Sequence, residues 1–256
     1  MVHGANAAVQ VEVAVDSATG AGAAAAAGAD RLELCSSLVE GGLSPSAGLL
    51  AAVRATVRMP VFAMVRPRGG DFCYDDGEFD AMCRDVVFLR EHGADGIVTG
   101  VLRTDGDVDA GRLRELVAAA APLPVTFHRA FDCVRDPDAA LETLIAAGVT
   151  RVLTSGQAVT AAAGADAIAD HVRRAAGRLG VVAGAGVRAA DVADLVQRTG
   201  VREVHLSATA WRPSPMTFAR DAVAIATAVP PAPDARRVTD AAAVAAVVEA
   251  LRSRAP

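Results

Sequence analysis

The sequence predicts an α/β fold, a single closed (β/α)8 barrel of the TIM type, on two observations. Eight short segments rich in β-branched or apolar residues recur along the chain, with starts 20 to 35 residues apart. Most of the intervals between them hold an amphipathic stretch rich in Ala, Leu and Val, so the repeating unit is a strand followed by a helix. Eight such units in 256 residues are typical of this barrel.

The elements can be placed in chain order from local signals. The expected strands are 11–15, 31–34, 61–65, 96–99, 125–128, 151–154, 181–183 and 203–206. Two helix starts are marked by a capping residue followed by proline, at Ser44-Pro45 before 47–56 and at Asp136-Pro137 before 139–147. Several units close on a glycine and enter the next strand, as in AAGAD, EHGADG and AAGVTR.

The last unit is irregular, because 211–237 contains WRPSP and PPAP before the expected helix 240–252. We expect a long loop or a short-helix excursion there. No linker divides the chain, so 1–256 is predicted to be one domain with its core at about 10–252. The alternative is an open doubly wound sheet, which usually carries G-x-G-x-x-G after its first strand. The corresponding AVDSATGAG does not match that pattern.

Composition excludes several function classes. The net charge of −5 gives no general attraction to nucleic acid. All 25 basic residues are arginine, so lysine Schiff-base chemistry and a pyridoxal-phosphate cofactor are excluded, and no nucleotide cofactor is expected either. The longest apolar runs, 21–27 and 241–248, are too short to span a membrane. The first residues, MVHGANAAVQ, lack a secretory signal, so we expect a cytoplasmic protein.

Polar residues at the carboxyl ends of the strands are the candidates for function, because barrel enzymes place their active sites there. Side-chain alternation predicts convergence of acid and base groups at the barrel mouth, and the candidate catalytic residues are Glu12, Glu33, His128, Asp132 and His205. The candidate anion clamp consists of Arg66, Arg68 and Arg129. Alternatively, arginines and glutamates form a buried network that only closes the barrel top. His92 and His171 are expected on solvated helix surfaces.

Small residues follow the last three expected strands, in TSGQ, GAGV and SAT. Glycine permits close approach of the backbone, and a following helix N-terminus offers free N–H groups to an anion. Ser155, Gly184, Gly186 and Ser207 are therefore candidate residues for a phosphate site. The sequence GAG also makes an ordinary tight turn between a strand and a helix.

Three cysteines fall on the same predicted face: Cys35 after strand 31–34, and Cys73 and Cys133 in loops after strands 61–65 and 125–128. Thiolates suit Cu(I), so these three are the candidate metal ligands, with Met64 or Met216 as a possible thioether partner. Their spacing matches no compact metal motif, and there is no C-x-x-C pair. Cys83, beside Met82, is interpreted as core packing.

The chain resembles the CutC family, named for a proposed role in copper homeostasis. The resemblance covers most of 11–216, through GADRLELCSSLVEGGLSPS, RPRGGDFCYDDGEF, GIVTGVLRTDGDVD, VTFHRAFD, RVLTSGQ, GAGV and VHLSATA. It implies a TIM barrel, a cytoplasmic and often oligomeric protein, and association with copper. It also implies that the family's shared positions are Glu12, Glu33, Cys35, Arg66, His128, Asp132 and His205.

Two positions depart from the family pattern. The first strand has Ala14 where many relatives carry cysteine, and HLSA at 205–208 replaces the common HSSA. Two hypotheses follow. The chain binds or traffics Cu(I), as the family description implies, or it is a barrel enzyme acting on a small anionic or phosphorylated molecule through the Glu/His/Arg pocket. In either case the expected partners are copper or a small anion and a second copy of the chain, with no nucleic acid and no membrane.

Overall fold

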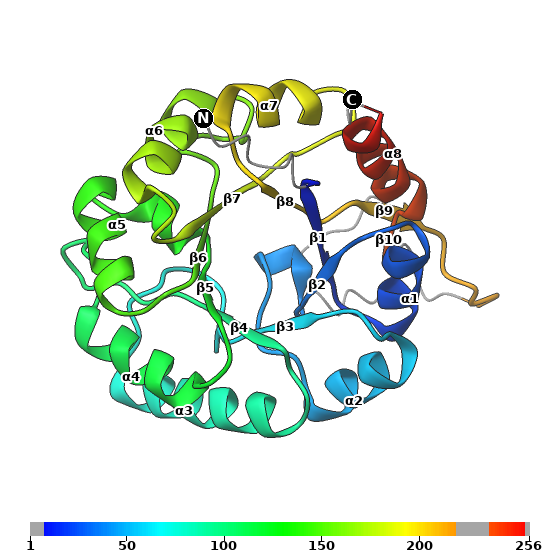
Figure 1. Cartoon of the computed structure of the whole chain (residues 1–256). Helices are drawn as coiled ribbons and strands as arrows, with labels where there is room; N and C mark the ends of the chain where they lie inside the picture. The colour runs from blue at the N-terminus through cyan, green and yellow to red at the C-terminus, as the bar shows by residue number, and fades with distance from the viewer. Residues whose placement is uncertain (1–7, 219–235, 254–256) are drawn as a thin grey trace.

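The computed structural model describes residues 8–218 and 236–253. Eight parallel strands close into a barrel in sequence order, with helices around the outside (Figure 1). The predicted (β/α)8 barrel is thereby confirmed. The strands are β1 Gln10–Val15, β2 Arg31–Leu34, β3 Val61–Met64, β4 Gly96–Thr99, β5 Val125–Phe127, β6 Arg151–Thr154, β7 Gly180–Gly184 and β8 Glu203–Leu206.

The helices lie close to where capping signals predict them. They are α1 Ala18–Ala26, α2 Ala47–Thr56, α3 Asp76–Glu91, α4 Ala110–Ala120, α5 Pro137–Ala146, α6 Ala165–Ala175, α7 Val192–Thr199 and α8 Ala241–Arg252, with short 3-10 turns η1 Leu38–Glu40 and η2 Arg129–Cys133. Asp75 and Glu78 form a capping box at α3, in which each side chain accepts a hydrogen bond from the other's backbone N–H. Asp136 caps α5, and Pro137 occupies its first turn.

Alternation along the strands separates two environments. In β1, Val11, Val13 and Val15 belong to the hydrophobic core, whereas Glu12 meets polar residues of the neighbouring strands. The parallel register places Glu12 beside Arg31 of β2 on one side and His205 of β8 on the other. The interior of the barrel therefore carries buried charge, and its apolar core lies mainly between the strands and the helices.

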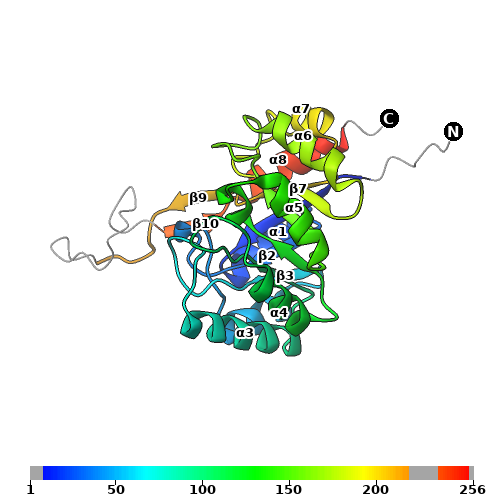
Figure 2. The same cartoon turned by 90° about the vertical axis from the view of Figure 1, so that its left-hand side faces the viewer.

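The segment after β8 forms a hairpin. Strands β9 Thr209–Arg212 and β10 Arg236–Thr239 pair antiparallel as a separate two-stranded sheet, which packs against α1. Figure 2 shows β9 and β10 next to each other beside the barrel. The expectation of a loop or short helix over 211–237 is wrong at both ends of that range. Residues 219–235 lie outside the described residues.

One helix residue is buried against expectation. His171 of α6 is 3% exposed, and its ring packs edge-on against Phe131. It shares the inner face of α6 with Ile168 and Ala175, at helical spacing. The prediction that His171 is solvated is therefore wrong, whereas His92 is exposed as expected. No helix in the described ranges 8–218 and 236–253 has the length and hydropathy needed to cross a membrane.

Candidate active site

A chain of charged side chains runs through the barrel interior. Arg31 donates hydrogen bonds to Glu12 Oε2 and to Glu203 Oε2. The other carboxylate oxygen of Glu12, Oε1, lies 2.7 Å from His205 Nδ1. Burial alone would raise the pKa of Glu12, but His205 and Arg31 outweigh it and lower this pKa to about 2. Glu12 is thus an ionised carboxylate whose two oxygens are both engaged.

Glu33 of β2 lies on the next level of the barrel, beside Ala14 in the register. Its Oε2 accepts a hydrogen bond from the Cys35 thiol at 3.4 Å and lies 3.9 Å from His205 Nε2. Its Oε1 is buried without a hydrogen-bond partner. Burial and the nearby Glu12 charge raise the pKa of Glu33 despite the opposing pull of His205. Glu33 is therefore a carboxyl group poised to exchange a proton.

His205 lies between these two carboxyl groups. Burial would lower its pKa, but Glu33 and Glu12 raise the pKa above its ordinary value. Because Nδ1 pairs with Glu12, the Nε2 edge of the ring is the one directed to Glu33. The three residues form an acid–base set with one carboxylate fixed and the other free to titrate.

His128 follows β5 and has a defined tautomer. Its Nδ1 accepts a hydrogen bond from the Ala130 backbone N–H at 3.1 Å, so Nε2 carries the proton of the neutral ring. That Nε2 is buried without a partner. Burial and the positive charge of Arg66 lower the pKa of His128 to about 3. His128 is therefore a neutral hydrogen-bond donor across the physiological pH range.

Arg66, just after β3, is only 5% exposed. Its terminal nitrogens donate to three backbone carbonyls, those of Glu40, Gly42 and Gly70. Its guanidinium lies over the Phe72 ring, 5.0 Å from the centroid, and its Nε is buried without a partner. No carboxylate side chain pairs with Arg66 among the described residues, so Glu12 and Glu33 are not its structural partners.

These groups surround a small central pocket of about 200 Å³. It is lined by Glu33, Glu40, Gly41, Met64, Arg66, Phe72, His128, Arg129, Leu153 and His205. Three of its lining residues each hold one buried polar atom that no protein atom satisfies: Glu33 Oε1, Arg66 Nε and His128 Nε2. Buried polar atoms are normally paired, so this concentration of unpaired atoms makes the central pocket the candidate ligand site. Together, these three lining residues hold two unpaired donors and one unpaired acceptor.

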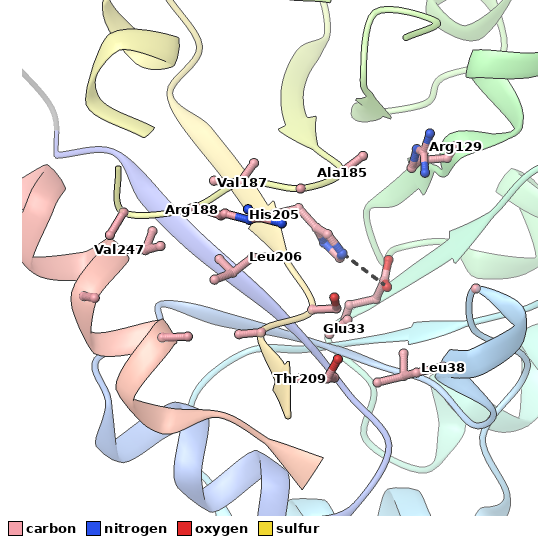
Figure 3. A pocket seen from close by; sticks show the side chains of 18 residues that line it. Glu33, Leu38, Arg129, Ala185, Val187, Arg188, His205, Leu206, Thr209 and Val247 are labelled. Atoms are coloured by element: carbon pink, nitrogen blue, oxygen red, sulfur yellow. Dashed lines mark ion pairs between the residues drawn. The ribbon is translucent and has the colours of Figure 1, made fainter. Parts of the chain in front are cut away.

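A larger side pocket of about 620 Å³ adjoins the central pocket. Glu33, Gly41, Arg129 and His205 line both pockets. Figure 3 shows His205 and Glu33 facing each other in the side pocket, with Val187, Leu206 and Val247 supplying part of an apolar wall. Arg188 also lines it, and the structure shows no ion pair for this guanidinium among the described residues. Sequence reasoning missed Arg188, although it directly follows GAGV.

Asp132 lines neither pocket. Its carboxylate accepts hydrogen bonds from the Ser155 backbone N–H and hydroxyl and from the Gln157 backbone N–H. It also pairs with Arg129 at 2.8 Å. Ser155 is fully buried and held in this network. The structure thus joins Asp132 to Ser155 at the start of the loop after β6, and both side chains accept hydrogen bonds from Arg129, which lines both pockets.

Of the remaining candidate anion-binding residues, some line a pocket and others do not. Arg68 turns away from both pockets and pairs with Glu78 and Asp71, so the structure does not bring it together with Arg66. Gly186 and Ser207 line the side pocket, whereas Gly184 does not. A Cβ on Gly184 would lie 2.5 Å from Leu153, so this glycine permits close packing.

One of the two nearby helix N-termini, that of α8, is already occupied by a carboxylate. The Asp240 side chain accepts the N–H groups of Ala242 and Ala243 at the start of α8. The Asp191 side chain accepts the Arg188 backbone N–H just before α7. Asp191 thus makes no capping hydrogen bond to α7 itself. Because the Asp240 carboxylate takes the place of an anionic ligand at α8, arginine side chains are the better anion donors beside that helix.

The candidate thiols do not gather. Cys35 is fully buried beside Glu33, Cys73 is partly exposed in the loop after β3, and Cys133 is exposed in η2. Among the described residues, the set with three ligand atoms within 4.8 Å is Glu12, Glu33 and His205, which contains no thiol. Arg31 and His205 already hold both oxygens of Glu12, so this set is poorly suited to a cation. Burial and the Glu33 carboxyl raise the pKa of Cys35 well above the usual range, which keeps it a thiol.

Comparison with known proteins gives consistent matches. The model of the CutC family matches residues 9–210. A CutC protein from Klebsiella pneumoniae is 51% identical over 211 residues, 82% of this chain and 84% of that protein. The copper homeostasis protein cutC homolog of Homo sapiens is 44% identical over 230 residues, 90% of this chain and 84% of that protein. The crystal structure of CutC from Streptococcus agalactiae, at 30% identity, has a TM-score of 0.73 and covers 77% of this chain and 97% of that one.

Proposed function

The chain belongs to the CutC family, and we propose that this member is a barrel enzyme that binds a small anionic molecule and moves a proton on it. One observation carries the proposal: three residues that line the central pocket, Glu33, Arg66 and His128, each hold a buried polar atom without a hydrogen-bond partner. Leaving such atoms unpaired costs about 1–3 kcal/mol each, which a bound ligand would recover.

The charges around the two pockets support an anionic ligand. Arg66, Arg129 and Arg188 line them, and within the described part of the chain the carboxylate ion pair that these arginines form is that of Arg129 with Asp132. Glu33 and His205 face each other at the wall shared by both pockets, where they can exchange a proton with a bound molecule. A ligand that spans both pockets would place its anionic group by Arg188 and its reacting group by Glu33.

Replacing Arg188 with glutamine is expected to weaken anion binding at least about 10-fold, because charge-assisted hydrogen bonds contribute about 1.5–3 kcal/mol. The probes are inorganic phosphate, pyruvate and dihydroxyacetone phosphate, with affinity measured by isothermal titration calorimetry. Arg114→Gln is the matched control, since Arg114 is exposed on α4 and lines neither pocket. Equal affinities in the two variants would remove Arg188 from the site, and no binding of any probe to the unaltered protein would contradict the proposal.

Cu(I) binding is a second candidate function, favoured by two sulfur side chains in one buried cluster. Cys35 and Met64 pack together, and a Cβ on Gly42 would lie 2.9 Å from Cys35 Sγ and 3.4 Å from Met64 Cε. A thiolate and a thioether are ligands that Cu(I) prefers. Ala14 offers no second thiolate in this wall.

If Cys35 binds Cu(I), affinity should fall at least about 10-fold in Cys35→Ser, since the soft thiolate is lost. An anaerobic competition titration against a chromogenic Cu(I) chelator measures this. Cys83→Ser on α3 is the control, because Cys83 lies outside both pockets. Unchanged affinity in Cys35→Ser would exclude that thiol, and a protein that never competes with the chelator would exclude the function.

A further inference from the structure

We propose that the central pocket acts on a carbonyl compound, with Glu33 removing a proton from the carbon next to the carbonyl group and His128 and Arg66 binding the carbonyl oxygen. This inference rests on the proposed function and specifies its substrate class and reaction. The unpaired atoms on the three lining residues differ in chemical type: two are hydrogen-bond donors and one is an acceptor.

The two donors suit a single oxygen atom that becomes negatively charged. His128 presents Nε2–H because its Nδ1 is occupied by the Ala130 N–H, and Arg66 presents Nε–H because its terminal nitrogens are occupied by backbone carbonyls. Both residues are at most 5% exposed, so these donors are shielded from bulk water. Donors fixed in advance in a buried site stabilise an oxyanion strongly, and a neutral imidazole is a known means of polarising a carbonyl group.

The remaining unpaired atom, Glu33 Oε1, is an acceptor and suits a base. The Cys35 thiol holds the other oxygen of the same carboxyl group, so the orientation of Glu33 is fixed. A hydrogen-bond acceptor in the same pocket as two donors favours a ligand that carries both an oxygen and an acidic hydrogen. An α-carbonyl C–H unit has this combination.

The proposed step is balanced without any further reactant. Glu33 Oε1 takes the proton from the α-carbon, the C–H electron pair becomes the C=C bond, and the carbonyl π pair moves to the oxygen. The enolate oxygen accepts hydrogen bonds from His128 and Arg66. Return of a proton to the same carbon exchanges hydrogen with solvent, and His205, 3.9 Å from Glu33 at the shared wall, links Glu33 to the side pocket.

The side pocket adds a constraint on the substrate. Glu33 and His205 line both pockets, so the reacting carbon lies where they meet. Arg188 lines only the side pocket, which therefore receives the anionic group. The substrate class is a small oxo compound with a carboxylate or phosphate group a few bonds away from the carbonyl.

The test is solvent exchange on two named probes. Pyruvate and dihydroxyacetone phosphate are incubated with the full chain in D2O, and loss of the α-hydrogen signal is followed by proton NMR. Exchange above the protein-free rate is expected with at least one probe that binds. It should fall at least about 100-fold in Glu33→Gln, which loses the base, and in His128→Asn, which loses the oxyanion donor.

The variants are chosen to keep the fold. Asparagine at 128 can still accept the Ala130 N–H, and glutamine at 33 can still accept the Cys35 thiol hydrogen. Arg114→Gln, far from both pockets, should exchange at the unaltered rate. Thermal unfolding followed by circular dichroism confirms that each variant is folded.

The possible outcomes distinguish failure of the carbonyl inference from failure of the proposed anion binding. Probes that bind without accelerated exchange, or exchange that survives in Glu33→Gln, would overturn the carbonyl inference and leave anion binding in place. Failure of both probes to bind would contradict the inference together with the proposed function. Exchange that is lost in Glu33→Gln but unchanged in His128→Asn would overturn the role of His128 as the carbonyl donor.

Discussion

Replacing Arg31 with methionine is expected to lower the free energy of unfolding by about 3–5 kcal/mol, because one partner of a buried charge network is removed. Arg31 is 5% exposed and donates to both Glu12 and Glu203. Methionine fills much of the space of the arginine stem but leaves the Glu12 carboxylate with His205 and without its arginine partner. Glu203 retains an ion pair with Arg151 at 3.4 Å, so the loss of stabilisation falls mainly on the Glu12 carboxylate.

Urea unfolding followed by circular dichroism measures this loss. Arg84→Met is the matched control, because Arg84 pairs with Asp80 on the exposed face of α3 with 78% of its side chain accessible. Exposed pairs contribute about 0–1 kcal/mol, so that variant should unfold close to the unaltered protein. Similar unfolding curves for the two variants would show that the buried network contributes no more than a surface pair.

Acidification is expected to remove stability through Glu12. Its pKa falls from an ordinary 4.5 to about 2 in the folded protein. A carboxyl group with a lowered folded pKa contributes stability above its unfolded pKa and loses it as the pH falls through the folded value. The contribution of Glu12 is therefore present above pH 5 and lost between about pH 5 and 2, and amounts to about 3 kcal/mol.

Glu12→Gln isolates this contribution. The variant should be less stable at pH 7, and its deficit should shrink by about 3 kcal/mol as the pH falls from 5 to 2. Glu33 works in the opposite direction, because its raised pKa favours the protonated folded state at low pH. The raised pKa of His205 gives stability that is already complete in this acidic window. Parallel pH profiles for the variant and the unaltered protein would contradict the assignment to Glu12.

The sequence was most informative where local chemistry determines structure. The segments 31–34, 96–99, 151–154 and 203–206 are strands with the predicted bounds, since short β-branched runs between turn residues have few alternatives. The hairpin at β9 and β10 could not be predicted, because its strands pair across 23 residues and include Arg212 and Arg236. His171 was misplaced because charged neighbours concealed its helical spacing with Ile168 and Ala175.

The candidate site was predicted in composition but only partly in geometry. Strand alternation correctly brought Glu12, Glu33 and His205 together, because the register of adjacent parallel strands constrains them. The roles of Arg68 and Asp132 depended on distant partners, respectively Glu78 and the loop after β6, which no local pattern reveals. Arg188 resembles any solvated arginine in the sequence, and only the folded loop after β7 places it in the side pocket.

The hairpin of β9 and β10 has a consequence for self-association. A closed barrel leaves no free sheet edge, whereas a two-stranded sheet exposes backbone donors and acceptors that another chain can extend. Here the pairing of Arg212 with Arg236 and of Trp211 with Arg237 places positive charge along the hairpin, and Arg212 and Arg236 are exposed. Two such hairpins approaching edge to edge would bring arginines together. Repulsion between these positive charges disfavours aggregation by strand addition.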